Sequence, residues 1–275
     1  MNINEMLDIM ALTFWSYRIK NENEEDDFIT LVRSELGMEA HVTSFDDGAY
    51  LCGVAYRPGS RNVLYKFERG TGGFDRLAEL LSWARNANIL KGDDNQCNGP
   101  QDEGNRSFDQ FKSYIENAQR LIIGGHSKGS RTGQRIAWLS CRLKESENLR
   151  GLKHVSLYQW AAFPLGDQSF ANVMQQYVDS GLLENYLFSM PGDPANSELF
   201  HDEDNPFLDG VDTGEIVKLP QVVKSSFYKK PDLGLRLIAH SCTIQSFAML
   251  SYLVDTEASI DQIVKMNKII KYCTN

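Results

Sequence analysis

The chain has 275 residues, of which 42% are hydrophobic and 24% charged, ordinary proportions for a globular protein with a sizeable core. The net charge of −9 argues against nucleic acids or anionic membranes as main partners. No stretch approaches the roughly 18 uninterrupted apolar residues of a membrane-spanning helix, so no membrane span is predicted.

Two further features bear on the compartment. The N-terminus has no basic region, and Glu5 and Asp8 interrupt its apolar pattern, which is unlike a signal peptide. The five cysteines are scattered and show no C-x-x-C spacing, which is typical of a reducing compartment and offers no zinc site. We therefore expect a cytoplasmic protein without a metal or a cofactor.

The N-terminal part of the chain predicts two helices followed by three strands. Apolar residues at helical spacing mark helices at residues 3–18 and 25–36. Runs rich in β-branched and aromatic residues predict strands at 40–45, 50–57 and 62–68. Turn sequences separate these strands, so we expect an antiparallel meander.

The next part of the chain leads to a central motif. It predicts a helix at 74–87, a polar loop at 91–106 that has no large apolar side chain, and a helix at 107–119.

The central motif is Gly125-His-Ser-Lys-Gly129, which matches G-x-S-x-G. Apolar residues at 121–123 predict a buried strand before it, and the pattern at 131–144 predicts a helix after it. Strand, G-x-S-x-G and helix together indicate a nucleophile elbow, in which Ser127 sits on a strained turn and exposes its hydroxyl.

The C-terminal half alternates strands with helices. Strands are predicted at 155–163, 186–190 and 215–219, and helices at 168–180, 242–254 and 258–272. This alternation predicts an α/β fold with a mostly parallel sheet, an antiparallel N-terminal meander and helices on both faces. We expect a single domain over residues 1–275, in which the segment 199–235 is a functional insertion over the site.

A serine nucleophile needs a general base, and five histidines are available. His240 precedes a predicted helix at the carboxyl edge of the sheet, where such sites form, and is the favoured base. His41 lies upstream in the meander, His126 belongs to the elbow itself, and His154 begins a strand at the opposite edge. His201, in an acidic run, is the alternative.

The base in turn needs a carboxylate to hold it. In folds with this elbow the acid comes between the serine and the histidine in the chain. Asp193 follows a predicted strand and is the favoured acid, and Asp167 is the alternative.

The oxyanion formed during acyl transfer requires N–H donors. The residue after the nucleophile, Lys128, supplies one, and we expect its side chain to form a structural salt bridge. Thr71, in the turn after the third strand, is the candidate for the second donor.

These segments together resemble the class 3 lipases, the fungal triacylglycerol lipase type of α/β-hydrolase, from about residue 50 to residue 240. Gly125-His-Ser-Lys-Gly129 is similar to the family's G-H-S-L-G and closer to a bacterial branch that has G-H-S-K-G and poorly defined substrates. The other similar segments are Phe67-Glu-Arg-Gly-Thr71, Trp160-Ala-Ala-Phe-Pro-Leu-Gly166 and Gly192-Asp-Pro194. Ser130 replaces a glycine of the family pattern, and the usual lid helix is missing.

The expected function is hydrolysis of carboxylic esters through Ser127, His240 and Asp193, with Thr71 and Lys128 as the oxyanion hole. The expected partner is a small-molecule or lipid ester. Alternatives are a phospholipase or acyltransferase that acts at membranes, or an inactive hydrolase fold used for binding. Because the segment 91–106 is too polar for a lipid-opened lid, we expect dispersed short- or medium-chain esters as substrates.

Overall fold

The structure is a computed structural model, which describes residues 1–46, 48–60, 62–70, 96, 98–146, 148–190, 213–220 and 241–274. The predicted helix at 74–87 lies outside these residues, as do the candidate site residues Thr71, Asp193, His201 and His240.

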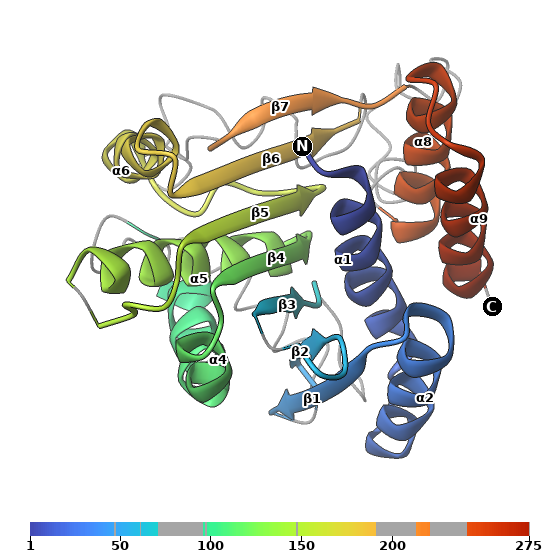
Figure 1. The fold of residues 1–275 in the computed structure, drawn as a ribbon, viewed down its shortest axis with the longest axis horizontal. Coiled ribbons are helices and arrows are strands. Elements are labelled where there is room, and N and C mark those ends of the chain that lie inside the picture. Colours follow the sequence, from blue (N-terminus) through green and yellow to red (C-terminus); the bar gives the residue numbers. More distant parts are fainter. Residues whose placement is uncertain are drawn as a thin grey trace.

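A mixed sheet forms the centre of the molecule, and it has seven strands within the described residues, in the order β1-β2-β3-β4-β5-β6-β7 (Figure 1). The strands are β1 (Glu39–Phe45), β2 (Tyr50–Tyr56), β3 (Val63–Glu68), β4 (Arg120–His126), β5 (His154–Trp160), β6 (Leu183–Ser189) and β7 (Glu215–Lys218). The first three pair antiparallel, whereas β3 to β7 run parallel to one another. This mixed sheet confirms the predicted fold class. The carboxyl ends of its parallel strands lie at one edge of the sheet.

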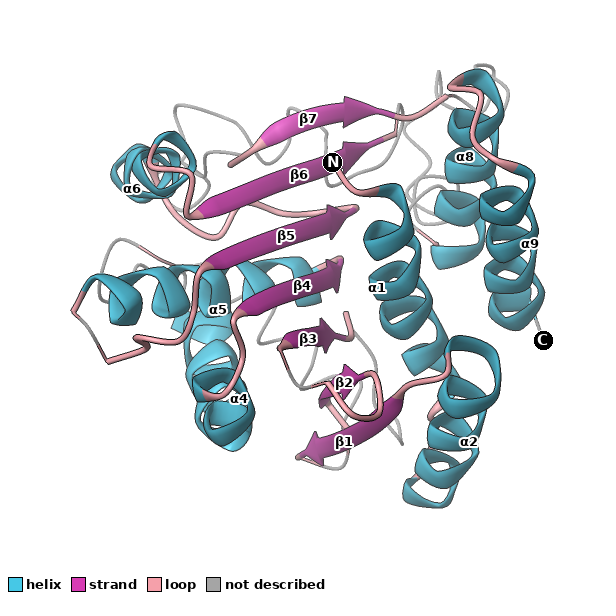
Figure 2. Ribbon diagram, viewed as in Figure 1, coloured by secondary structure: helices cyan, strands magenta, loops and turns pink. Residues whose placement is uncertain are grey.

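Helices cover both faces of the sheet (Figure 2). One face carries α1 (Ile3–Trp15), α2 (Glu25–Leu36), α8 (Cys242–Asp255) and α9 (Ile260–Thr274). The other face carries α4 (Asn98–Glu116), α5 (Lys128–Glu145) and α6 (Gln168–Asp179). Two short 3₁₀ helices, η1 (Ser16–Arg18) and η2 (Glu22–Glu24), connect α1 to α2.

Helix α1 is buried along its length because it lies between the sheet and α9. Every residue from Met6 to Trp15 is buried, and both β4 and α9 pack against the helix. Its 13 residues correspond to about 20 Å, short of the roughly 30 Å hydrocarbon core of a bilayer. Within the described ranges, no helix is both long and apolar enough to cross a membrane.

Two predicted boundaries are wrong. Residues 98–106, predicted as part of a polar loop, form the first half of α4, in which the buried residues include the polar Gln101 and Glu103. Strand β5 ends at Trp160 and not at residue 163, because Ala161 has a φ of 48°, which turns the chain out of the strand.

Candidate active site

Ser127 lies in the turn between β4 and α5, at the carboxyl edge of the sheet. Its φ of 58° and ψ of −127° are strained values for a residue that has a side chain. Its backbone N–H donates to the carbonyl of Trp160 at 2.9 Å, so the ladder between β4 and β5 holds the strained residue in place. Ser127 thus occupies the strained turn between a strand and a helix in which the sequence predicted a nucleophile elbow.

The two motif glycines allow the close packing that this turn requires. A Cβ on Gly125 would lie 2.3 Å from the Gly129 carbonyl oxygen, and one on Gly129 would lie 2.4 Å from the Glu68 carbonyl oxygen. Larger residues at either position would therefore push α5 away from β4 or from the end of β3. The strand–turn–helix context predicted for the motif is confirmed.

Ser130, which follows the motif, also stabilises the turn. Its Oγ lies 2.8 Å from the carbonyl oxygen of Gly125 and 3.2 Å from that of Trp160. A serine at this position therefore adds a hydrogen bond between the first turn of α5 and the ends of β4 and β5.

Lys128 directs its side chain away from the sheet edge and into the protein. Its Nζ is fully buried, 3.0 Å from Glu103 Oε1 and 3.1 Å from the Ala49 carbonyl oxygen. The predicted structural salt bridge of Lys128 is thus confirmed, and its partner lies on α4. Because Lys128 is the first residue of α5, its backbone N–H belongs to the helix terminus beside Ser127.

A second buried ion pair lies at the end of β3. Lys66 and Glu68 form it, and the Glu68 carboxylate also accepts hydrogen bonds from Tyr50 Oη at 2.6 Å and Ser107 Oγ at 2.9 Å. Glu68 immediately precedes the Arg69-Gly70 turn, so the pair anchors the strand that leads to the predicted oxyanion donor. The sequence alone did not predict this cluster, because Tyr50 and Ser107 are 18 and 39 residues away from Glu68 in the chain.

Arg69 holds the same turn from its other side. Its guanidinium donates to the carbonyl of Ile19 at 2.7 Å and to that of Gly48. Burial lowers the pKa of Arg69 to about 10, which still leaves it charged near neutral pH.

Tyr17 links the turn after β3 to the elbow. Its hydroxyl oxygen accepts the Gly70 N–H at 2.9 Å and lies 2.8 Å from His126 Nδ1. Burial, with a smaller contribution from Cys242, raises the pKa of Tyr17 well above its usual value, so its hydroxyl stays protonated. The His126 ring also contacts Cys242 Sγ at 3.6 Å and meets the Phe14 ring edge to face.

Two of the remaining histidines lie away from the elbow. His154 begins β5 at the opposite edge of the sheet and is 3.3 Å from a Glu184 carboxylate oxygen. His41 lies in β1, where it stacks on Tyr56. Both positions agree with the reasons for setting these residues aside as bases.

Asp167, the alternative acid, is the N-cap of α6. Its Oδ1 accepts the backbone N–H groups of Ser169 and Phe170 at 2.9 and 3.2 Å. Among the described residues, no three His, Cys, Asp or Glu side chains form a group that could hold a metal ion.

No protein-family model and no curated protein matches the sequence. Among solved structures, the crystal structure of a lipase from Rhizopus microsporus var. chinensis is similar, with a TM-score of 0.50 over 78% of this chain and 74% of that chain, at 14% identity. At this identity the likeness shows the fold alone, a mixed sheet with helices on both faces that this chain shares with that lipase.

Proposed function

We propose that this protein is a serine hydrolase that cleaves carboxylic esters, with Ser127 as its nucleophile. The observation that carries the proposal is the strained backbone of Ser127 at the junction of β4 and α5. Backbone strain of this kind persists only where the surrounding structure enforces it, and it is concentrated at functional sites. Here Gly125, Gly129 and Ser130 enforce it.

His240 is the proposed base, and the position of Cys242 supports it. Cys242 begins α8 and its sulfur lies 3.6 Å from the ring of His126, the neighbour of Ser127. His240 precedes Cys242 by two residues, a separation that an extended chain spans in about 7 Å. The contact of Cys242 with His126 therefore supports His240 as the base.

Asp193 is the proposed acid. It follows β6 by four residues, and β6 is separated from β4 by β5 alone, a distance of about 10 Å across the sheet. The alternative, Asp167, already has a structural role as the cap of α6. We therefore assign orientation of the imidazole to Asp193.

In the proposed reaction, the Ser127 oxygen attacks the ester carbonyl while His240 accepts the hydroxyl proton. The N–H groups of Lys128 and Thr71 stabilise the oxyanion. Collapse of the tetrahedral intermediate transfers the proton from His240 to the departing alcohol. Water then attacks the acyl-enzyme, again with His240 as the base, and releases the carboxylic acid.

The test is labelling with a fluorophosphonate probe together with hydrolysis of p-nitrophenyl esters. Ser127→Ala should lose both signals, whereas Ser140→Ala, which removes a buried hydroxyl from the same helix, should keep them. Retention of labelling in Ser127→Ala would exclude Ser127 as the nucleophile. A folded wild-type protein that is not labelled would instead support the inactive binding fold.

The assignment of the base has a separate test. His240→Ala should abolish ester turnover and labelling, whereas His201→Ala should leave both close to the wild type. The reverse result would transfer the role of base to His201.

A further inference from the structure

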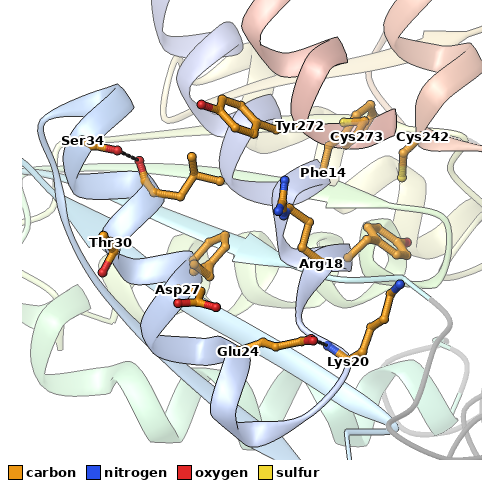
Figure 3. Close-up of a pocket in the computed structure, with 13 residues that line it drawn as sticks. Phe14, Arg18, Lys20, Glu24, Asp27, Thr30, Ser34, Cys242, Tyr272 and Cys273 are labelled. Carbon is orange, nitrogen blue, oxygen red and sulfur yellow. Dashed lines mark hydrogen bonds between the residues drawn. The ribbon is translucent and has the colours of Figure 1, made fainter. Parts of the chain in front are cut away.

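A cavity of about 560 Å³ lies between α1, α2 and the adjacent ends of α8 and α9 (Figure 3). Its volume falls within the range of about 300–1,000 Å³ that is usual for small-molecule sites. Phe14, Tyr17 and Cys242 form part of its wall, and each of them also contacts the His126 ring. None of the residues 125–129 is among the described residues that line the cavity.

Much of the cavity wall is apolar. Phe14 and Phe28 are buried core residues, and Leu31 and Tyr272 extend the surface they form. Cys273 also lines the cavity. Burial raises the pKa of its thiol to about 12, so this side chain is neutral. A ligand with a hydrocarbon chain would therefore exchange water for apolar contacts in this space.

One cation extends into the cavity. Figure 3 shows the Arg18 side chain between α2 on one side and Phe14 and Tyr272 on the other. Its guanidinium carbon lies 5.7 Å from the centre of the Tyr272 ring. Arg18 forms no ion pair with the described part of the chain, and its planar N–H groups match the geometry of a carboxylate.

The other charged residues of the cavity wall determine which net charge of the ligand is favoured. Lys20 adds a second cation, and Glu24 and Asp27 contribute two carboxylates, so the formal charges of the described wall cancel. Glu24 accepts the backbone N–H of Lys20 at 2.6 Å, which fixes this carboxylate beside η2. The two carboxylates disfavour a dianion, so a single negative charge beside Arg18 fits best.

We propose that this cavity binds an amphipathic monocarboxylate, with its carboxylate on Arg18 and its chain against Phe14, Phe28 and Leu31. The site does not depend on the proposed hydrolysis, although an acid released by ester cleavage would be a ligand of this class.

The experiment uses the full-length Ser127→Ala protein, so that neither turnover nor acylation contributes to the signal. Octanoate, titrated by calorimetry, should bind saturably at one site, and octanol should bind at least tenfold more weakly. Arg18→Gln should weaken octanoate at least tenfold, while Arg18→Lys should retain part of the affinity. Leu31→Trp should weaken octanoate binding, because the indole occupies part of the space proposed for the hydrocarbon chain.

Arg33→Gln is the matched control, since Arg33 is exposed on α2 and does not line the cavity. It should leave octanoate binding unchanged. Equal affinities for octanol and octanoate, or an unchanged octanoate affinity in Arg18→Gln, would overturn the proposal. A melting curve for each variant separates loss of the site from loss of the fold. If octanoate does not bind, fluorophosphonate labelling of the wild-type protein should still occur, so the two proposals fail independently.

Discussion

At the scale of single residues, the Tyr17 hydroxyl joins the two backbone segments that the proposed mechanism uses. It is hydrogen-bonded to Gly70 N–H, one residue before Thr71, and to the ring of His126, one residue before Ser127. A helix ending near this residue was predictable from apolar spacing. The contact between Tyr17 and His126 was not predictable from the sequence, because 109 residues separate them.

Tyr17→Phe should therefore lower kcat by about ten- to a hundredfold, since small shifts of catalytic donors have effects of this size. KM for a short-chain p-nitrophenyl ester should change little, because the variant adds no bulk. Tyr177→Phe is the control: its hydroxyl donates to Glu145 at the far end of α5, so kcat should remain at the wild-type value. Equal losses of kcat in the two variants would refute a positioning role for Tyr17.

The strain at Ser127 leads to a prediction about stability. Glycine tolerates a φ of 58°, whereas alanine retains the steric cost. Ser127→Gly should thus be more stable than Ser127→Ala by about 1 kcal/mol in urea unfolding, although both are inactive. At Ser140, inside α5, the order should reverse, because glycine costs about 1 kcal/mol relative to alanine in a helix. The same order at both positions would mean that Ser127 carries no strain.

At the scale of the elements, buried charges connect α4 to α5 and occupy the adjacent end of β3. Lys128 on α5 pairs with Glu103 on α4, and Ser107 of α4 donates to Glu68 of β3. This explains why residues 98–106 were predicted as a loop. A helix is recognised in a sequence by its apolar stripe, and the buried face of α4 here carries a carboxylate whose partner comes from another helix.

The buried pair of Lys128 and Glu103 can be tested directly. Glu103→Gln should destabilise the protein by about 3–5 kcal/mol in urea unfolding, because it leaves a fully buried ammonium without its carboxylate. The double variant Glu103→Leu/Lys128→Met should recover most of this loss. It should also keep esterase activity, since the backbone N–H of residue 128 remains. A double variant that is folded but inactive would show that the lysine side chain contributes to catalysis.

At the scale of the whole molecule, the alternation of strands and helices was sufficient to predict the sheet and its two helical layers. The motif was sufficient to place Ser127 and Lys128, because G-x-S-x-G imposes a local geometry. The roles of Thr71, Asp193 and His240 stay predictions, since they depend on long-range positions that residue spacing does not encode.

The predicted insertion at 199–235 contains β7, which the structure places in the central sheet as a parallel strand beside β6.

The buried charges of α4 bear on the physical state of the substrate. In lipases that act at oil–water interfaces, a lid opens when its apolar face meets lipid. Residues 98–106 belong to α4, where Glu103 is fully buried against Lys128, so opening this part of the chain would break a buried ion pair. The net charge of −9 further opposes attraction to anionic lipid.

We therefore expect the rate of ester hydrolysis to saturate smoothly as the substrate concentration passes through its solubility limit. Tributyrin hydrolysis, measured across this limit beside a p-nitrophenyl butyrate series, tests the expectation. Ser127→Ala provides the background rate. A sharp rise in rate once droplets form, or a strong preference for long-chain emulsions, would indicate a lid elsewhere in the chain and an interfacial lipase. A smooth curve would indicate an esterase of dispersed short- or medium-chain substrates, as a site without a lipid-opened lid requires.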